Sequence, residues 1–473
     1  MAIGYIGPER KDGDEQPYMG GMLKLRLPFL HYGIDIQSMA QGAVLACTHL
    51  GALVTMMEYL GISEDVALLA VALNGAFYLW HTSFGDPGIA GWITAGIPLY
   101  ITYLLSYTEG AERMQALIAF QAILAVVFLV LGVTGIANYI IAHFPISLRS
   151  GILLAAGMAS LIRIFTPTQP FYDLYPISFT ISLLFSFFIL FSNRALEYRR
   201  QHSWFQWIAG WGIVPGYVIG YLVGGAVGEV AFPTMSQITD KFLISMPFGK
   251  MIDTMSPFGV GFPGLELWVA GISMAVVAYI LAFGDMLILQ SLIGEVNSAR
   301  PDEKVIYSPT RNHVVTAWRN ILEVLYSPYV CLCGPIWAGA SAVIANRGMN
   351  SSRKELDSYW AAANSFNWGA LVLFMSPIVV ILMPARYIGF GITLALQGYL
   401  CVYIAYEMCT NNVQRGIAGV MAGCIIAANF TDISPILSGP TLGLLLGFFL
   451  WFTLKPKTDV SKMEELKEVM GET

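Results

Sequence analysis

Long apolar runs follow one another along most of this chain, and they constrain its fold more than any other feature. Between Ile36 and Leu454 the runs are interrupted mainly by short polar or Gly/Pro-containing stretches. Because about 20 apolar residues cross a bilayer as a helix, this region has room for about a dozen or more spans. Charged residues make up 12% of the chain, about half the share in soluble domains. The sequence therefore predicts an all-α polytopic membrane protein embedded in the lipid bilayer.

The apolar runs divide into fourteen predicted transmembrane segments, seven on each side of a polar stretch at 228–263. The predicted segments are 37–60, 64–80, 81–105, 111–134, 146–165, 174–192 and 204–227, followed by 264–293, 314–331, 332–345, 365–384, 386–408, 412–429 and 435–454. Because seven is odd, the second half is predicted to be inverted relative to the first. The expected architecture is a 7+7 inverted repeat.

The positions of lysine and arginine set the predicted orientation. Most of the 25 such residues fall on the cytoplasmic side if the N-terminus is inside, as the positive-inside rule requires. The N-terminal segment 1–36 has no pattern of a cleaved signal peptide, so it and the tail 455–473 are predicted to be cytoplasmic. The loop 228–263 is then extracytoplasmic, and the polar run 298–320 is expected to be a solvated cytoplasmic connection. We expect a plasma (inner) membrane location and, without a basic stripe, no nucleic-acid partner.

Two of the fourteen segments are broken by glycine and proline. The third contains HTSFGDPGIAGW, starting at His81, and the tenth contains VCLCGPIWAGAS, starting at Val330. Each predicts a short strand followed by a half-helix that begins inside the membrane, with Asp86 as N-cap and Pro87 in the first turn of the third segment. Paired interruptions of this kind mark transporter binding sites. Ordinary kinks in continuous helices are the alternative.

Three stretches carry a resemblance to a known family. They are AQGAVLACTHLGALVTMMEYLGISEDVALLAVALNGAFYLWHTSFGDP, LVLGVTGIANYIIAHFPISLRSGILLAAGM and AYILAFGDMLILQSLIGE. The chain resembles the uracil permease-like fold of the nucleobase/ascorbate transporters and their relatives, the hypoxanthine/guanine permeases, benzoate transporters and sulfate-type transporters. The resemblance implies a core domain (37–134 and 264–384), a gate domain (135–227 and 385–454) and a homodimer through the gate. The tenth-segment acidic residue of nucleobase carriers is missing before Asn346, so the chain is a divergent member of this group.

Asp285 is the sharpest candidate for function. A carboxylate inside a span costs about 2.5–3.5 kcal/mol, and such residues usually mark substrate or ion pathways. The family's eighth helix carries an acidic residue that binds substrate or accepts the coupling proton, so the resemblance implies both roles for Asp285. We expect H+ as the coupling ion, with Na+ as the alternative. A structural carboxylate bonded to a neighbouring helix is the competing interpretation.

Polar residues of the first and third segments are further candidates for substrate binding. His49 lies near the middle of the first segment, two turns beyond Gln41, and could bind a proton or the substrate. A histidine bonded to a backbone carbonyl is an equally good interpretation. On the predicted strand of the third segment, His81 and Ser83 would offer polar groups to the cavity and Phe84 an apolar wall.

The tenth segment supplies the last candidates. The resemblance implies that Cys333, Gly334, Ile336 and Trp337 meet the substrate there. Trp337 could stack on a planar ring, although packing between helices explains it equally well. Cys331 and Cys333 have no nearby His or Cys partners in the sequence, so no metal site or cofactor is predicted.

These features predict a secondary active transporter that works by alternating access. The first choice is a proton-coupled symporter of a small planar or anionic solute, such as a nucleobase (uracil or xanthine) or an organic carboxylate. A sulfate-type or other anion transporter of the same fold is the alternative, and a channel is the second alternative. An enzyme is not expected, because the sequence has no nucleophile with a base, no HExxH and no paired carboxylates in one span.

Overall fold

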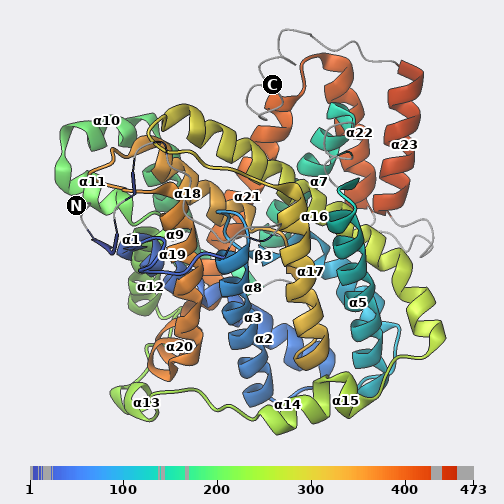
Figure 1. Cartoon of the computed structure of the whole chain (residues 1–473). Coiled ribbons are helices and arrows are strands. Elements are labelled where there is room, and N and C mark those ends of the chain that lie inside the picture. The colour runs from blue at the N-terminus through green and yellow to red at the C-terminus, as the bar shows by residue number, and fades with distance from the viewer. Residues whose placement is uncertain are drawn as a thin grey trace.

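The computed structural model describes residues 4–8, 10, 11, 13, 23, 25–136, 139, 144–165, 170–427 and 439–454. The chain forms a bundle of helices with very little strand (Figure 1). By length and composition, six spans of the described part can cross a membrane: Ile36–Leu60, Glu64–Phe84, Ala111–Val133, Ile146–Phe165, Leu265–Ala299 and Ser376–Met408. Two bent helix pairs raise this number to eight. A multi-pass helical membrane protein is confirmed, and the fourteen-segment 7+7 repeat stays a prediction.

The helices of the first half follow the apolar runs closely. They are α1 (Ile36–Leu45), α2 (Cys47–Leu60), α3 (Glu64–Phe84), α4 (Ile97–Leu105), α5 (Ala111–Val133), α7 (Ile146–Phe165), α8 (Pro170–Leu174), α9 (Pro176–Phe191), α10 (Asn193–Gln201), α11 (Ser203–Gly210) and α12 (Val214–Val227). Between α11 and α12 the chain bends by 83°, because Gly212 has a positive φ of 59° that favours glycine.

The second half begins after three short helices of the 228–263 stretch. These are α13 (Met235–Thr239), α14 (Phe248–Met255) and α15 (Pro257–Val260), and they lie at the end of the bundle opposite α10 and α11 (Figure 1). The longer helices that follow are α16 (Leu265–Ala299), α17 (Pro309–Tyr326), α18 (Ala338–Asn350), α19 (Tyr359–Gly369), α20 (Ser376–Leu382), α21 (Arg386–Met408), α22 (Asn412–Ala427) and α23 (Gly439–Leu454).

Two short strands lie near the middle of the bundle. Strand β3 (Gly91–Trp92) pairs antiparallel with β4 (Cys333–Gly334). A single 3-10 turn, Thr94–Gly96, joins β3 to α4, and three residues join β4 to α18. The tenth segment is therefore a strand followed by a half-helix, as predicted, whereas the third segment contains the same two elements at other residues than predicted. A separate pair, β1 (Tyr5–Ile6) with β2 (Ile34–Asp35), ties the N-terminal segment to the start of α1.

The third segment is nevertheless built differently from the prediction. The stretch from His81 to Phe84 is the last turn of α3 and not a strand, because the helical pattern of α3 continues until Gly85. Asp86 is not a helix N-cap and Pro87 does not begin a helix. Pro98 lies instead in the first turn of the half-helix α4.

The expected solvated connection at 298–320 is also wrong over its second half. Residues from Pro309 onward form α17, and its polar side chains are buried. Arg319, Asn320 and Glu323 each have an exposed fraction of 0%. These polar residues form hydrogen bonds with other buried groups, and a sequence pattern does not reveal such partners.

Helices pack mainly within two groups. In one group α5 packs against α16 and α17, α16 against α18, α3 against α17 and α19, and α1 against α19. In the other group α7 packs against α21 and α22, α9 against α12 and α21, and α10 against α9 and α11. The division into core and gate domains at the predicted boundaries remains a prediction, but these contacts define two groups of helices.

Candidate functional site

The two strands cross with their backbones in close contact. Gly91 pairs with Gly334, and Trp92 pairs with Cys333. A Cβ atom on Gly91 would lie 2.6 Å from the backbone nitrogen of Trp337, and one on Gly334 would lie 2.7 Å from the carbonyl carbon of Trp92. Glycine is required at both positions because backbone atoms cannot move aside as a flexible side chain can.

Side chains of α17 complete the hydrogen bonding of this strand pair. Asn320 donates from Nδ2 to the carbonyl oxygen of Cys333 at 2.9 Å and accepts from the Cys333 backbone N–H through Oδ1 at 3.1 Å. Arg319 donates to the carbonyl oxygens of Gly334 at 2.9 Å and Gly91 at 3.4 Å. The Asn320 amide thus takes the place of a neighbouring strand, and Arg319 joins β3 to β4.

A second set of polar contacts orients Trp92. The Glu323 carboxylate accepts hydrogen bonds from Asn74 and, at 2.7 Å, from Nε2 of Gln121. The Asn74 side chain in turn accepts a hydrogen bond from the Trp92 indole at 2.8 Å. Because all of these groups are buried, the contacts fix the indole ring beside the strand crossing.

A small closed cavity lies beside the strand crossing. Nine residues line it: Thr48, His49, Tyr78, Trp92, Thr94, Trp337, Phe390, Leu394 and Gln397. The His49 ring centroid lies 5.0 Å from those of Tyr78 and Trp92, and 6.2 Å from that of Trp337. The space open to the centre of a water molecule is about 10 Å³, which is close to the minimum for one ordered water.

The lining of this cavity contains polar atoms without partners. Both ring nitrogens of His49 and Oε1 of Gln397 are buried, and no described residue forms a hydrogen bond with them. Buried polar groups are nearly always hydrogen-bonded, because leaving one unpaired costs about 1–3 kcal/mol. These atoms are therefore suited to bind a ligand or water.

Positive charge lies behind two of the aromatic walls. The Arg319 guanidinium carbon lies 5.0 Å from the centroid of the Tyr78 ring, and that of Arg163 lies 5.3 Å from the centroid of Phe390. Arg163 forms no ion pair with any described residue, and two of its nitrogens are buried without hydrogen bonds there. The half-helix α18 starts at this cavity, with Trp337 as its N-cap residue and no side-chain cap.

Several of the predicted site residues lie at or directly behind this cavity. His49 and Trp337 line it. Cys333 and Gly334 form β4, and Ile336 packs against Gly88 in the chain before β3. The structure thus brings two predicted residues into the lining and places three in the wall behind it.

Four other predicted residues lie away from the cavity lining. Ser83 and Phe84 line a separate apolar groove at the end of α3, and His81 is buried in the same helical turn. Gln41 donates from Nε2 to the carbonyl oxygen of Gly210 at 3.1 Å, so it joins α1 to α11. The assumed strand had placed His81, Ser83 and Phe84 in the cavity, and their position in α3 explains the difference.

Asp285 lies in the middle of α16 and is not part of the cavity lining. Its exposed fraction is 6%. Within the described ranges the Asp285 carboxylate forms no hydrogen bond or ion pair. Tyr100 and Cys401 lie close enough to interact with it electrostatically. In the described part of the chain, no residue of a neighbouring helix is therefore bonded to the Asp285 carboxylate, as the competing interpretation would require.

Asp86 has a different role from the predicted N-cap of its own helix. Its carboxylate forms a buried ion pair with Arg311 and accepts the Ser308 backbone N–H at 3.1 Å. Ser308 is the N-cap of α17. Asp86 therefore attaches the chain before β3 to the first turn of α17.

Sequence reasoning missed most of the cavity lining and all of its support from α17. Gln397 is a polar residue within the apolar run ITLALQGYL, and the mid-span polar position that selected His49 also applies to it. Trp92 follows the Gly-Pro break of the third segment as Trp337 does in the tenth. No comparable signal marks Tyr78 or Phe390, because an aromatic residue in a span is usually a packing residue.

Comparison with known proteins gives similarities of fold. No protein-family model matches the chain, and no curated protein matches it. The structure of murine Slc26a9, an anion transporter in the inward-facing state, has a TM-score of 0.48 and 14% identity, with 90% of this chain and 70% of that chain covered. The transmembrane domain of a cyanobacterium bicarbonate transporter, BicA, has a TM-score of 0.43 and 14% identity, with 89% and 96% covered. A second structure, the overall structure of SLC26A9, has a TM-score of 0.46 and 13% identity, with 88% and 66% covered.

Proposed function

We propose that the protein is a secondary active transporter that binds a small anion in the cavity beside the β3–β4 crossing. The observation that carries this proposal is a closed cavity with unpaired buried polar atoms, located where a half-helix begins. Irregular backbone inside a membrane bundle is tolerated where it lines such a cavity. Half-helix starts at a cavity are the usual substrate sites of secondary transporters.

Three features favour an anionic solute. The first-turn N–H groups of α18 have no side-chain cap, so the positive end of the helix dipole is available. Arg319 and Arg163 add positive charge behind Tyr78 and Phe390. The small free space favours a compact anion, because a nucleobase would require the aromatic walls to move apart.

Alternating access is supported by the origin of the cavity walls. Tyr78 and Trp337 come from the group of helices that contains α3 and α18, whereas Phe390 and Gln397 come from α21 in the other group. His49 lies in α2, which packs against both α3 and α21. A movement between the two groups would therefore open the cavity. Gln41 joins the same two groups through its hydrogen bond to Gly210.

Proton coupling through Asp285 is the second part of the proposal. A buried carboxylate without a described partner is costly to keep charged, and protonation removes that cost. If Asp285 carries the coupled proton, Asp285→Asn will abolish uptake driven by a pH gradient and leave thermal stability in detergent close to that of the parent. Unchanged proton-driven uptake by this variant would remove Asp285 from the coupling role, and a dependence on Na+ in its place would identify a different ion.

The anion site is tested by ligand-induced stabilisation of the purified protein. Chloride, bicarbonate, sulfate, aliphatic and aromatic carboxylates, uracil and xanthine are compared, since a bound ligand raises the unfolding temperature in proportion to ln(1 + [L]/Kd). We expect a compact anion to stabilise the parent and to stabilise His49→Gln and Trp337→Ala much less. His31→Gln, in the N-terminal loop, is the control. Stabilisation by neutral nucleobases alone would contradict the anion assignment.

Uptake into proteoliposomes then distinguishes a transporter from a channel. A transporter gives saturable uptake of the stabilising solute and exchange against solute inside the vesicle. Flux that rises linearly with concentration and shows no exchange would favour the channel.

A further inference from the structure

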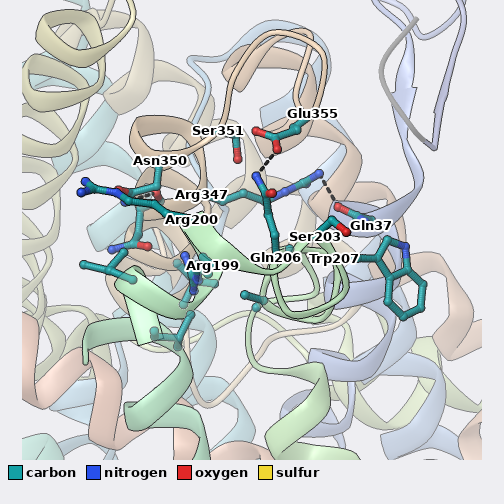
Figure 2. Close-up of a pocket in the computed structure, with 17 residues that line it drawn as sticks. Gln37, Arg199, Arg200, Ser203, Gln206, Trp207, Arg347, Asn350, Ser351 and Glu355 are labelled. Atoms are coloured by element: carbon teal, nitrogen blue, oxygen red, sulfur yellow. Dashed lines mark hydrogen bonds between the residues drawn. The ribbon is translucent and has the colours of Figure 1, made fainter. Parts of the chain in front are cut away.

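A second, larger pocket lies at the end of the bundle where α10 and α11 meet α18. Its volume is about 440 Å³, within the range of small-molecule sites. Figure 2 shows the side chains of Arg199, Arg200, Gln206 and Arg347 around it. The pocket shares no lining residue with the cavity at the strand crossing, so it is a separate site.

The positive charge of this pocket is concentrated on two arginines. Arg347 is neutralised by a buried ion pair with Asp35 and also donates to Gln37 at 2.6 Å. Arg199 donates one hydrogen bond, to the Ile189 carbonyl oxygen at 2.6 Å, and its Nε has no partner among the described residues. Neither Arg199 nor Arg200 pairs with a carboxylate anywhere in the described ranges.

The one carboxylate that lines the pocket is already occupied. Glu355 accepts a hydrogen bond from the Gln206 side chain through one oxygen. Its other oxygen accepts the backbone N–H and the hydroxyl of Ser352, at 2.8 and 3.0 Å. Glu355 is thus held at the rim, and it does not neutralise Arg199 or Arg200.

The surroundings of the pocket match the interface between lipid headgroups and hydrocarbon. The apolar helix α9 ends at Phe191, and the chain then bends by 64° into the basic helix α10. Tyr198, Trp204 and Trp207 follow, with exposed fractions of 51%, 58% and 54%. Exposed Trp and Tyr beside Arg are typical of membrane interfaces, which places the pocket at headgroup depth.

We propose that this pocket binds the phosphate-bearing headgroup of an anionic phospholipid. The phosphate is bound by Arg199 and Arg200, since arginine pairs with phosphate through parallel N–H donors. The side chains of Ser203, Asn346 and Asn350 also line the pocket and are suited to the hydroxyl groups of a glycerol-type headgroup. The lipid chains extend along the exposed aromatic surface near Trp204.

The walls of the pocket come from both groups of helices. Gln37 and Arg347 lie in α1 and α18, whereas Arg199 and Gln206 lie in α10 and α11. A headgroup bound between them bridges the two groups and stabilises their present arrangement. This regulatory consequence rests on the proposed alternating access, whereas the binding itself does not.

Native mass spectrometry of the detergent-purified full chain tests the binding. The protein is mixed with phosphatidylglycerol or phosphatidylcholine, and the retained lipid is counted. We expect preferential retention of phosphatidylglycerol, weakened roughly 30-fold in Arg199→Gln/Arg200→Gln by the loss of two arginine–phosphate contacts. Arg194→Gln is the matched control, because Arg194 is exposed on the same helix and does not line the pocket. Arg199→Lys/Arg200→Lys should keep part of the binding that Arg199→Gln/Arg200→Gln loses.

Two further measurements keep the outcomes distinct. Lipid-free thermal unfolding of the double variant should equal that of Arg194→Gln, so that lost binding reflects lost charge and not lost fold. Inorganic phosphate is then used as a competitor, and we expect it to displace phosphatidylglycerol only at much higher concentration. Equal retention of both lipids, equal losses in the double variant and the control, or tight binding of inorganic phosphate alone would overturn the lipid assignment. None of these results depends on whether the protein transports an anion.

Discussion

The two broken segments form the same device but are anchored differently. The tenth segment is fixed at its strand, where Asn320 exchanges two hydrogen bonds with Cys333. The third segment is fixed before its strand, where Asp86 pairs with Arg311 and accepts the Ser308 N–H. Both anchors belong to α17 or to its N-cap. The comparison shows that one helix holds both halves of the crossing, at its first turn and at its middle.

Arg319 holds both broken segments, because it binds a strand of each. It donates to Gly334 in β4 and to Gly91 in β3. Because it is fully buried, its loss cannot be compensated by water. The comparison therefore predicts that replacing Arg319 lowers the free energy of unfolding more than breaking either anchor alone.

The largest effect is expected for Arg319→Gln. The change removes two hydrogen bonds from a charged donor to the strand carbonyls, at about 1.5–3 kcal/mol each, so the free energy of unfolding should fall by about 3–5 kcal/mol. Chemical denaturation in detergent measures it. Arg194→Gln, on an exposed site, should change stability by less than about 0.5 kcal/mol. An Arg319→Gln protein as stable as this control would show that α17 does not support the crossing.

The next largest effect is expected for Gly91→Ala and Gly334→Ala. Each should lower the free energy of unfolding by about 3 kcal/mol, the upper end of the cost of overpacking. The added Cβ at Gly91 or Gly334 meets backbone atoms of the opposite segment, so both variants should lose stability to a similar degree. Gly423→Ala in α22 is the control, because a Cβ there meets nothing within 4 Å. Very unequal losses at 91 and 334 would mean that one strand can move away from the other.

Asp86→Asn should have an effect no larger than this, about 3 kcal/mol, the lower end of the cost of removing one partner of a buried ion pair. Asparagine still accepts the Ser308 N–H, but it leaves Arg311 without its ion pair. Since this anchor lies before the strand, we expect anion-induced stabilisation to remain in Asp86→Asn and to be lost in Arg319→Gln. Loss of the ligand response in both variants would remove the distinction between the two anchors.

A carboxylate outside the two segments gives the smallest expected effect. Burial alone would raise the pKa of Glu229, but the Ser178 hydroxyl and the backbone N–H groups of Ser178 and Ile177 together lower that pKa below 4.5. Its contribution to stability is therefore complete above about pH 4.5 and is lost as the pH falls through the lowered value. Because Glu229 is only partly buried, Glu229→Gln should cost less than about 1 kcal/mol at neutral pH. Unfolding midpoints measured at pH 7 and pH 4 should differ less in this variant than in the parent.

The bounds of a helix were predictable where proline or charged residues mark the ends of its apolar run. Helices α7 and α21 have the predicted bounds, 146–165 and 386–408, because proline or charged residues flank them. The strand of the third segment was predicted ten residues too early, since His81 to Phe84 contains polar residues that nevertheless continue α3. The interpretation of 309–320 as a solvated loop was wrong because charge alone does not show whether buried partners exist.

The candidate site was only partly predictable for the same reason. His49 was predicted as a mid-span polar residue and Trp337 from the family resemblance, and both line the cavity. Tyr78 and Phe390 could not be distinguished from ordinary packing residues. Asp285 was selected by its cost in a membrane, but its distance in sequence from the breaks gave no information about whether it joins the cavity.

The sequence by itself determined a helical, multi-pass membrane protein with two interrupted segments, because hydropathy and the positions of glycine and proline are local properties that need no partner. Tertiary structure alone decided where the strands form, which side chains line the cavity and how α17 supports the crossing. Several of the hydrogen bonds behind those features join residues more than 200 positions apart, such as Arg311 with Asp86 and Gln121 with Glu323. Whether a buried polar residue is stabilised depends on such partners, which come together only when the chain has folded.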